Sequence, residues 1–107
     1  MAKKGDLYFI RYYGDNGRKG RGRPAVIVSS EEVNLTEDAV MVAYLSAQPS
    51  FDGSRTCVDL TSTGRDSVAV VNRVTSLPKY RLGDYIGHIT PEEEAKVNAA
   101  LCIALGL

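Results

Sequence analysis

The stretch Arg23-Pro24-Ala25-Val26-Ile27-Val28-Ser29 predicts a buried strand early in the chain. Its centre is an unbroken run of four apolar residues, three of them β-branched, a pattern that favours extended backbone covered on both sides. Pro24 suits the first position of a strand, where its missing amide hydrogen interrupts no ladder. We therefore expect a mainly β fold built around this strand.

Further strands are expected on either side of this run. Residues 7–13 (Leu-Tyr-Phe-Ile-Arg-Tyr-Tyr) are rich in aromatic and β-branched residues. Later candidates lie at residues 40–45, 56–60, 67–74 and 85–89. An acidic loop is expected at residues 31–38.

A basic segment precedes the central run. Residues 14–23 read Gly-Asp-Asn-Gly-Arg-Lys-Gly-Arg-Gly-Arg, with four glycines, four cations and no apolar residue. Such a segment cannot pack into a core, so we expect an exposed, mobile loop. The chain is neutral overall, yet residues 1–24 carry seven basic and two acidic groups, a net charge of +5. This asymmetry favours an anionic partner at the basic end.

The C-terminal segment carries the signals of one helix. Thr90 is the expected N-cap, Pro91 the first helical residue, and Glu93 completes a capping box. Apolar residues then recur at helical spacing and form one stripe, made of Val97, Ala100, Leu101, Ala104 and Leu105. Five to seven short strands and one terminal helix predict a small barrel, closed or nearly closed, in a single domain over residues 1–107.

Composition excludes several classes of protein. The chain is 44% hydrophobic and 24% charged, which suits a packed core and argues against disorder. Its apolar runs are too short to span a bilayer and its N-terminus lacks a signal-peptide core, so we expect a soluble cytoplasmic protein without membrane contact. Cys57 and Cys102 are expected to be buried, reduced thiols, and the single His88 to have a structural role. No metal site is predicted, and any catalysis must use arginine, hydroxyl or carboxylate groups.

Short motifs in a fixed order run along nearly the whole chain. They are Lys4-Gly5-Asp6-Leu7-Tyr8, residues 22–29 (Gly-Arg-Pro-Ala-Val-Ile-Val-Ser), Leu45-Ser46-Ala47-Gln48, Asp66-Ser67-Val68, Arg81-Leu82-Gly83, Ile86-Gly87 and Leu105-Gly106-Leu107. In this order and spacing the sequence resembles the MazF/PemK (Kid) family of toxin endoribonucleases. The resemblance implies an SH3-like barrel with a C-terminal helix, of the CcdB/PemK-like kind, assembled as a homodimer.

The same resemblance implies an activity and partners. It implies sequence-specific cleavage of single-stranded RNA that needs neither metal nor cofactor. It also implies a toxin of a type II toxin–antitoxin system, neutralised by a cognate antitoxin with an acidic C-terminal segment. Operator DNA would be reached only through that antitoxin.

The catalytic residues follow from the resemblance position by position. In the family an arginine in the Arg-Pro motif and a Thr or Ser at the end of the third strand carry the chemistry, which here correspond to Arg23 and Ser46. RNA is cleaved without metal when its 2′-hydroxyl attacks the adjacent phosphorus, leaving a 2′,3′-cyclic phosphate and a 5′-hydroxyl. Arg23 is a planar cation suited to phosphate. Because an arginine pKa exceeds about 12, we expect electrostatic stabilisation first, with proton donation to the leaving oxygen as a family-implied possibility.

RNA binding is expected from the basic loop and from the ends of later strands. The candidate residues are Arg18, Lys19, Arg21, Gln48, Asn72 and Arg73. Gln48 would hold a base edge or orient Ser46; its structural alternative is a polar strand end. Asn72 stands where the family often has a carboxylate, and Thr75 where it commonly has an arginine, so base recognition departs from the family pattern there.

Two other functions stay open at the level of sequence. A non-catalytic toxin resembling the gyrase poison CcdB would share the barrel, but that protein depends on a Trp-containing tail and this chain has no Trp. An SH3-like module that binds RNA or protein without cutting differs from the enzyme only in the use of Arg23 and Ser46.

Overall fold

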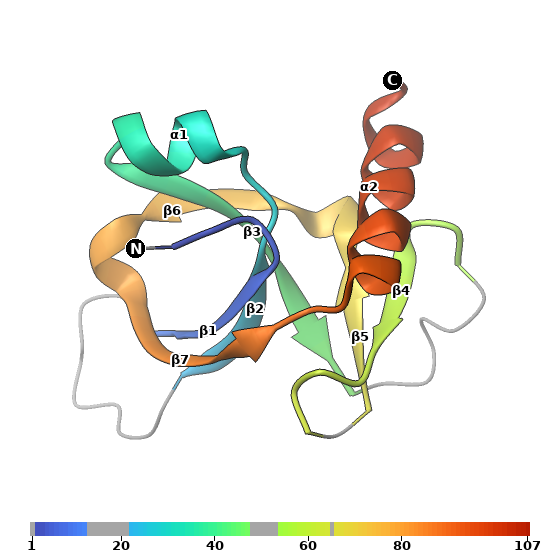
Figure 1. Cartoon of the computed structure of the whole chain (residues 1–107), viewed down its shortest axis with the longest axis horizontal. Coiled ribbons are helices and arrows are strands. Elements are labelled where there is room, and N and C mark those ends of the chain that lie inside the picture. The colour runs from blue at the N-terminus through green and yellow to red at the C-terminus, as the bar shows by residue number, and fades with distance from the viewer. Residues whose placement is uncertain (1, 13–21, 48–53, 65) are drawn as a thin grey trace.

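Short strands curl into a small barrel, and the C-terminal helix runs along one side of it (Figure 1). The computed structural model describes residues 2–12, 22–47, 54–64 and 66–107. The strands are β1 (Asp6–Ile10), β2 (Arg23–Ile27), β3 (Ala39–Ser46), β4 (Cys57–Leu60), β5 (Ser67–Val70), β6 (Thr75–Pro78) and β7 (Leu82–His88). The helices are α1 (Glu31–Thr36) and α2 (Pro91–Leu105), and two 3₁₀ turns, η3 (Val71–Arg73) and η4 (Lys79–Arg81), flank β6.

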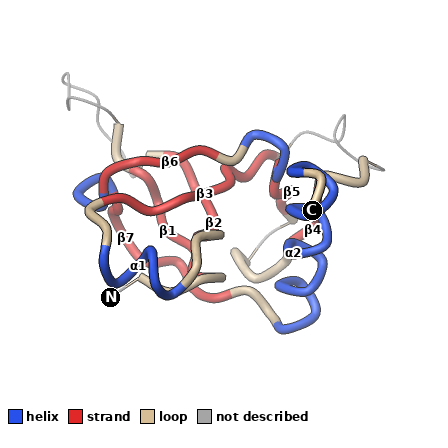
Figure 2. Tube along the Cα trace, turned by 90° about the horizontal axis from the view of Figure 1, so that it is seen from above, coloured by secondary structure: helices blue, strands red, loops and turns tan. Residues whose placement is uncertain are grey.

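The strands form one antiparallel sheet in the order β4-β5-β3-β2-β1-β7, with β6 paired to β3. β3 is central because one edge pairs with β2, while the other pairs with β6 along its first half and with β5 at its end. Among the described residues no ladder joins the two ends of this order, so the sheet does not close. Figure 2 shows β4 and β5 grouped with α2 at one end of the molecule. The predicted mainly β fold with a C-terminal helix is confirmed, as an open barrel.

Two clusters of buried residues occupy the two faces of the sheet. The helix-side core lies under α2 and consists of Leu7, Val26, Val28, Ala43, Leu45, Val58, Leu60, Ala69, Val71, Ile89, Val97 and Ala100. The barrel-side core consists of Ile10, Ala25, Ile27, Val40, Val42 and Leu77. Successive residues of a strand point to opposite faces, so β2 supplies Val26 to one core and Ala25 and Ile27 to the other. Burial on both faces explains the unbroken apolar run of this strand.

α2 begins with the capping box that the sequence predicts. The Thr90 hydroxyl accepts a hydrogen bond from the Glu93 amide (3.1 Å), and the Glu93 carboxylate accepts one from the Thr90 amide (2.9 Å). The same carboxylate accepts hydrogen bonds from the Thr61 amide and the Ser62 hydroxyl, which ties the helix to the segment after β4. Burial raises the pKa of Glu93, but these hydrogen bonds outweigh it, so the pKa lies below its ordinary value.

The apolar stripe of α2 is buried only at its start. Val97 and Ala100 lie in the helix-side core and Leu101 packs against it, whereas Ala104 and Leu105 are exposed. The reason is visible in Figure 1, where the last turns of α2 extend past the strands. In the described part of the chain no helix is both long enough and apolar enough to cross a membrane.

Both cysteines are free, but they are not both buried. Cys57 is half-buried in β4, and Cys102 is exposed on α2. The prediction of two buried thiols is therefore wrong for Cys102, because it lies beyond Leu101, after which every residue of the chain is exposed.

Residues 31–36 form the helix α1, so the prediction of a loop there is wrong. Ser30 caps this helix by accepting a hydrogen bond from the Val33 amide (3.3 Å). The buried Asn34 donates to the Ser29 carbonyl (3.1 Å), and the Ser29 hydroxyl accepts from the Met41 amide (3.0 Å). Side-chain hydrogen bonds through Ser29, which follows β2 and is bonded to β3, thus hold a helix too short to be recognised by periodicity.

The predicted strand over residues 67–74 is interrupted. β5 ends at Val70, the turn η3 follows, and β6 begins at Thr75. β5 pairs with the end of β3 whereas β6 pairs with its beginning, so the chain must bend between them. The first strand is also shorter than predicted, since the Arg11 amide leaves the ladder and donates to the Arg81 carbonyl (2.8 Å).

Candidate nucleic-acid interface

β2 and β3 pair over three residues and then part. Ala25 opposite Tyr44 is the last pair; beyond it β2 continues along β1, and β3 continues along β5. Figure 1 shows the two strand ends diverging. Arg23 and Ser46 each lie two residues beyond this last pair, so by alternation both side chains leave the sheet on the barrel side. The two predicted catalytic residues therefore share one face, at the diverging ends of neighbouring strands.

The guanidinium of Arg23 stacks on an aromatic ring. Its Cζ lies 4.3 Å from the centroid of the Tyr44 ring. Arg23 is exposed, and Tyr44 is half-buried against the barrel-side core. Among the residues that the structure describes, the guanidinium forms no hydrogen bond and no ion pair. Its N–H groups are therefore available to a phosphate.

Gly22 fixes the point at which β2 begins. Its φ is +91°, and a Cβ added there would lie 1.9 Å from the Ile10 carbonyl oxygen. No side chain fits into that space, and the left-handed backbone favours glycine as well. The glycine therefore allows the start of β2 to approach β1, and it sets the backbone position of Arg23.

Two arginines, which we call the arginine anchor (Arg11 and Arg81), hold the end of β1 to η4. Nε and Nη2 of Arg81 donate to the Arg11 carbonyl at 3.0 and 2.7 Å. Arg11 in turn donates from Nη1 to the Tyr80 carbonyl at 3.0 Å. Close by, a Cβ on Gly83 would lie 2.9 Å from the Phe9 carbonyl oxygen. The motif Arg81-Leu82-Gly83 is thus structural.

Asn72 and Arg73 are exposed residues of η3, which contacts β3. The strands on either side of η3 pair with Leu45 and with Val42 of β3. The turn therefore lies beside the part of β3 that carries Tyr44. The structure brings these two predicted RNA-binding residues to the strand that ends in Ser46.

Four other predicted RNA-binding residues, Arg18, Lys19, Arg21 and Gln48, lie outside the described residues. Their role stays a prediction from the sequence. The described part of the candidate interface therefore consists of Arg23, Ser46 and η3.

Tyrosines extend the face that carries Arg23. Tyr8 lies opposite Ala25 on one side and opposite Tyr85 on the other, so its side chain is on the barrel side as well. The rings of Tyr8 and Tyr85 meet edge to face with centroids 5.4 Å apart. Burial, and after it the charges of Asp6 and Tyr85, raise the pKa of Tyr8. This face combines a cation with aromatic rings, a combination typical of surfaces that bind single-stranded nucleic acids.

His88 has the structural role that the sequence predicts. Its Nδ1 lies 2.8 Å from Oδ1 of the buried Asp6, whose other oxygen accepts a hydrogen bond from the Lys3 amide (2.8 Å). The ring lies over Gly5, where an added Cβ would be 2.8 Å from His88 Cε1. Within the described ranges, no three His, Cys, Asp or Glu side chains are grouped as metal ligands would be.

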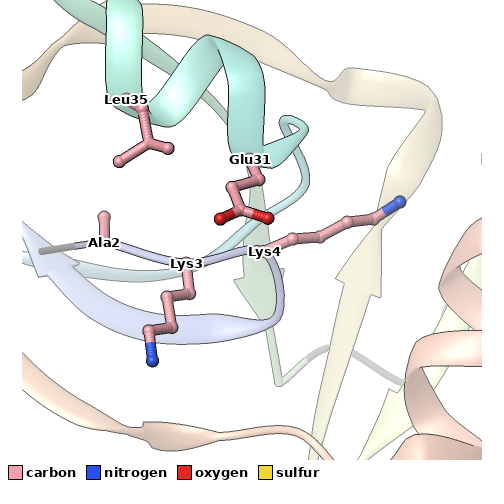
Figure 3. Close-up of a pocket in the computed structure, with 5 residues that line it drawn as sticks. All are labelled: Ala2, Lys3, Lys4, Glu31 and Leu35. Carbon is pink, nitrogen blue, oxygen red and sulfur yellow. The ribbon is translucent and has the colours of Figure 1, made fainter.

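A separate cavity of about 380 Å³ lies between the N-terminal segment and α1 (Figure 3). Its described lining residues are Ala2, Lys3, Lys4, Glu31 and Leu35. Figure 3 shows Ala2 and Leu35 facing each other across it. None of these five was predicted as a site residue, so this cavity is not part of the candidate interface.

The chain is similar to known proteins over nearly its whole length, and this similarity agrees with the fold. A family model described as PemK-like, MazF-like toxin of type II toxin–antitoxin system matches residues 3–105. Endoribonuclease EndoA of Bacillus subtilis is 30% identical over 112 aligned residues, covering 100% of this chain and 97% of the relative. Endoribonuclease MazF of Staphylococcus saprophyticus is 27% identical, covering 100% and 93%.

A solved structure gives the same result in three dimensions. An endoribonuclease in complex with its cognate antitoxin, from Mycobacterial species, superposes with a TM-score of 0.82 at 28% identity and covers 100% of this chain and 97% of that one. The family model spans nearly the whole chain. The chain therefore belongs to the PemK-like, MazF-like toxins of type II toxin–antitoxin systems.

Proposed function

We propose that this chain is the endoribonuclease toxin of a type II toxin–antitoxin system and cleaves single-stranded RNA at short sequences without a metal ion. The observation that carries the proposal is the exposed guanidinium of Arg23, free of acceptors among the described residues and on the same face as Ser46. Membership of the toxin family and the names of the two relatives, both endoribonucleases, support it.

The reaction needs charge stabilisation more than it needs a strong base. The 2′-hydroxyl of the RNA gives up its proton as its oxygen forms a bond to the adjacent phosphorus. The bond from phosphorus to the 5′-oxygen breaks, and one proton is taken up by the leaving oxygen, so no proton is gained or lost overall. Negative charge grows on the phosphoryl oxygens in between. Arg23 stabilises this charge through paired N–H donors, and the Ser46 hydroxyl donates to the same phosphate. The products are a 2′,3′-cyclic phosphate and a 5′-hydroxyl.

The rest of the RNA is held by cations and rings around this phosphate. Arg18, Lys19 and Arg21 contact the backbone of the RNA, while Gln48, Asn72 and Arg73 contact bases. The tyrosines on the barrel side offer stacking surfaces. Backbone contacts would position the strand, and base contacts would choose the cleavage site.

The proposal includes partners and assembly. A related endoribonuclease has been solved with its cognate antitoxin, which supports an antitoxin for this chain. An acidic antitoxin segment would compete with RNA for the basic face, and operator DNA would be bound through the antitoxin alone. We also propose a cytoplasmic homodimer, because a cleft for several nucleotides is hard to build on one chain of 107 residues.

The deciding experiment is cleavage of a long single-stranded RNA in the presence of EDTA, with the ends of the products mapped. We expect 2′,3′-cyclic phosphate and 5′-hydroxyl ends at a short recurring sequence. Arg23→Ala should cut at least a hundredfold more slowly, since deletion of one transition-state donor costs about 2.7–4 kcal/mol. Arg55→Ala is the matched control, because it removes an exposed arginine from the segment before β4.

The outcome separates the three functions considered for this fold. RNA binding without cleavage would favour the binding module, and neither binding nor cleavage would favour a CcdB-like toxin. Cleavage by Arg23→Ala at the rate of Arg55→Ala would overturn the catalytic assignment. Ser46→Ala should also be slow, whereas Ser46→Thr should keep its activity because the hydroxyl is retained.

A further inference from the structure

Arg23 has four rotatable side-chain bonds and stands at an exposed strand end, so its backbone alone does not fix the guanidinium. A catalytic cation must be in place before the transition state forms, because its reorientation during the reaction would add to the activation free energy. Something must therefore hold the plane of this guanidinium. Among the described residues, the side-chain partner of this guanidinium is the Tyr44 ring, with Cζ at 4.3 Å from the ring centroid.

The ring is itself held by the fold. Tyr44 pairs with Ala25 in the ladder between β2 and β3, and its side chain packs against the barrel-side core. Arg23 lies two residues from Ala25 on the neighbouring strand, a diagonal spacing that long and aromatic side chains bridge. The register of the sheet thus places the ring under the guanidinium.

An aromatic partner leaves the N–H groups of the arginine available to the phosphate. A carboxylate partner would occupy N–H donors and neutralise the charge that the phosphate needs. A ring face contacts the guanidinium plane and leaves every in-plane N–H group free. The stack therefore restricts the orientation of Arg23 without using its donors.

We propose that Tyr44 is a positioning residue for Arg23, whose ring holds the guanidinium plane so that its N–H edge meets the scissile phosphate. The proposal rests on the RNA-cleaving function proposed above. It assigns to the ring, and not to the phenol hydroxyl, a contribution to the rate of the chemical step. Ser46 lies two residues further along the same strand and on the same face, so one strand would position both groups that contact the phosphate.

The test compares two substitutions of Tyr44 by their single-turnover rates at saturating enzyme and by their steady-state KM for RNA. Tyr44→Leu keeps apolar bulk against the barrel-side core but has no aromatic face, and it should slow cleavage about three- to tenfold with little change in KM. Tyr44→Phe keeps the ring and should cleave within about twofold of the unchanged chain. Thermal unfolding of both variants controls for loss of structure.

A double-mutant cycle separates positioning from an independent effect. In the Arg23→Ala background, Tyr44→Leu should cause no further loss of rate, because the group that the ring holds is already gone. The Nε proton of Arg23 should show an upfield NMR shift from the ring in the unchanged chain and in Tyr44→Phe, but not in Tyr44→Leu. If Tyr44 only filled space, Tyr44→Leu would cause the same loss of rate with and without Arg23.

Failure of the positioning role and failure of the proposed function give different results. A rate for Tyr44→Leu equal to that of the unchanged chain would overturn the positioning role, as would an equal loss in the presence and absence of Arg23. An unshifted Nε proton would show that the stack does not form in solution and would also overturn it. Failure of the unchanged chain to cleave any RNA would instead overturn the proposed function, and the catalytic use of the stack with it.

Discussion

Two arginines near the β1–β2 hairpin are used in opposite ways. Arg81 donates through Nε and Nη2 to the Arg11 carbonyl, so its guanidinium is engaged with the protein's own backbone. Arg23 is exposed, and its guanidinium lies over the Tyr44 ring and forms no hydrogen bond within the part of the chain that the structure describes. The same side chain is thus a structural clamp in one place and an available cation in the other. What it donates to, and not its exposure, distinguishes the two roles.

The two arginines should differ most in RNA cleavage when each is replaced by lysine. Arg23→Lys keeps the charge but loses the planar paired donors and the stack, so we expect about a hundredfold slower RNA cleavage, or about 2.7 kcal/mol. Arg81→Lys should leave the rate per folded molecule within about twofold, because Arg81 does not face the phosphate in this scheme. Cleavage rates of the two purified variants decide the matter. Equal losses would mean that the two regions are not functionally different.

A second contrast concerns the glycine before Arg23. Gly22→Ala should lower the free energy of unfolding by about 2–3 kcal/mol, since both the positive φ and the Ile10 carbonyl oppose a side chain. Gly64→Ala is the matched control: its φ is +88°, but nothing lies within 4 Å of the added Cβ. Gly64→Ala should therefore cost only about 1 kcal/mol. Urea unfolding measures both, and a similar loss for both would show that the close approach of β2 to β1 is unimportant.

Removing the arginine anchor should affect stability and leave the chemistry intact. We expect Arg81→Ala to lower the free energy of unfolding by about 1–2 kcal/mol, because two charge-assisted hydrogen bonds to a carbonyl are lost. The measurement is chemical denaturation, with cleavage corrected for the folded fraction. A large loss of cleavage in fully folded Arg81→Ala would place the anchor in the active site and break the comparison.

The smallest effect is expected at Glu93, in the first turn of α2, and it depends on pH. Hydrogen bonds to the folded state lower the pKa of Glu93 below its ordinary value of 4.5, so the charged form stabilises the fold. This contribution is fully present above about pH 4.5 and is lost as the pH falls through the lowered pKa. Glu93→Gln should cost about 1 kcal/mol at pH 7, and the difference from the unchanged chain should shrink below about pH 4.5.

The control for this experiment is Glu92→Gln, because Glu92 is the exposed neighbour in the same helical turn. In thermal unfolding between pH 3 and 7, the change in stability caused by Glu92→Gln should depend little on pH. A constant difference for Glu93→Gln over that range would mean that the charge of the carboxylate contributes nothing.

Much of the fold could be predicted because its signals are local. The apolar run after Pro24 predicted β2, and Thr90 with Glu93 predicted the start of α2; both depend on a few adjacent residues. The family resemblance was confirmed over residues 3–105. Helix α1 could not be predicted from periodicity, because tertiary hydrogen bonds of Asn34 hold it. The bend at η3 was missed for a similar reason, since the pairing of β3 imposes it.

The candidate site was predictable only in part. Arg23 and Ser46 came from the motif, but the sequence did not connect either of them with Tyr44. A signal was present, because Tyr44 lies two residues before Ser46 and so shares its face. Using it required the register that pairs Tyr44 with Ala25, which depends on residues far apart in the chain. The anchor formed by Arg11 and Arg81 depends on a pairing 70 residues apart and left no local trace.

The threefold pairing of β3 has a consequence for how the chain folds. β3 contributes one strand to each of three ladders, with β2, β5 and β6, whereas α2 forms no ladder and packs on the sheet through Val97 and Ala100. β3 should therefore belong to the folding nucleus, and its contacts should be largely formed in the transition state. Val42→Ala should slow folding, while Val97→Ala in α2 should mainly speed unfolding, a difference that stopped-flow kinetics would resolve. Because the ladders of β3 join distant segments, the nucleus carries a high entropic cost, and the toxin is expected to become active slowly after synthesis.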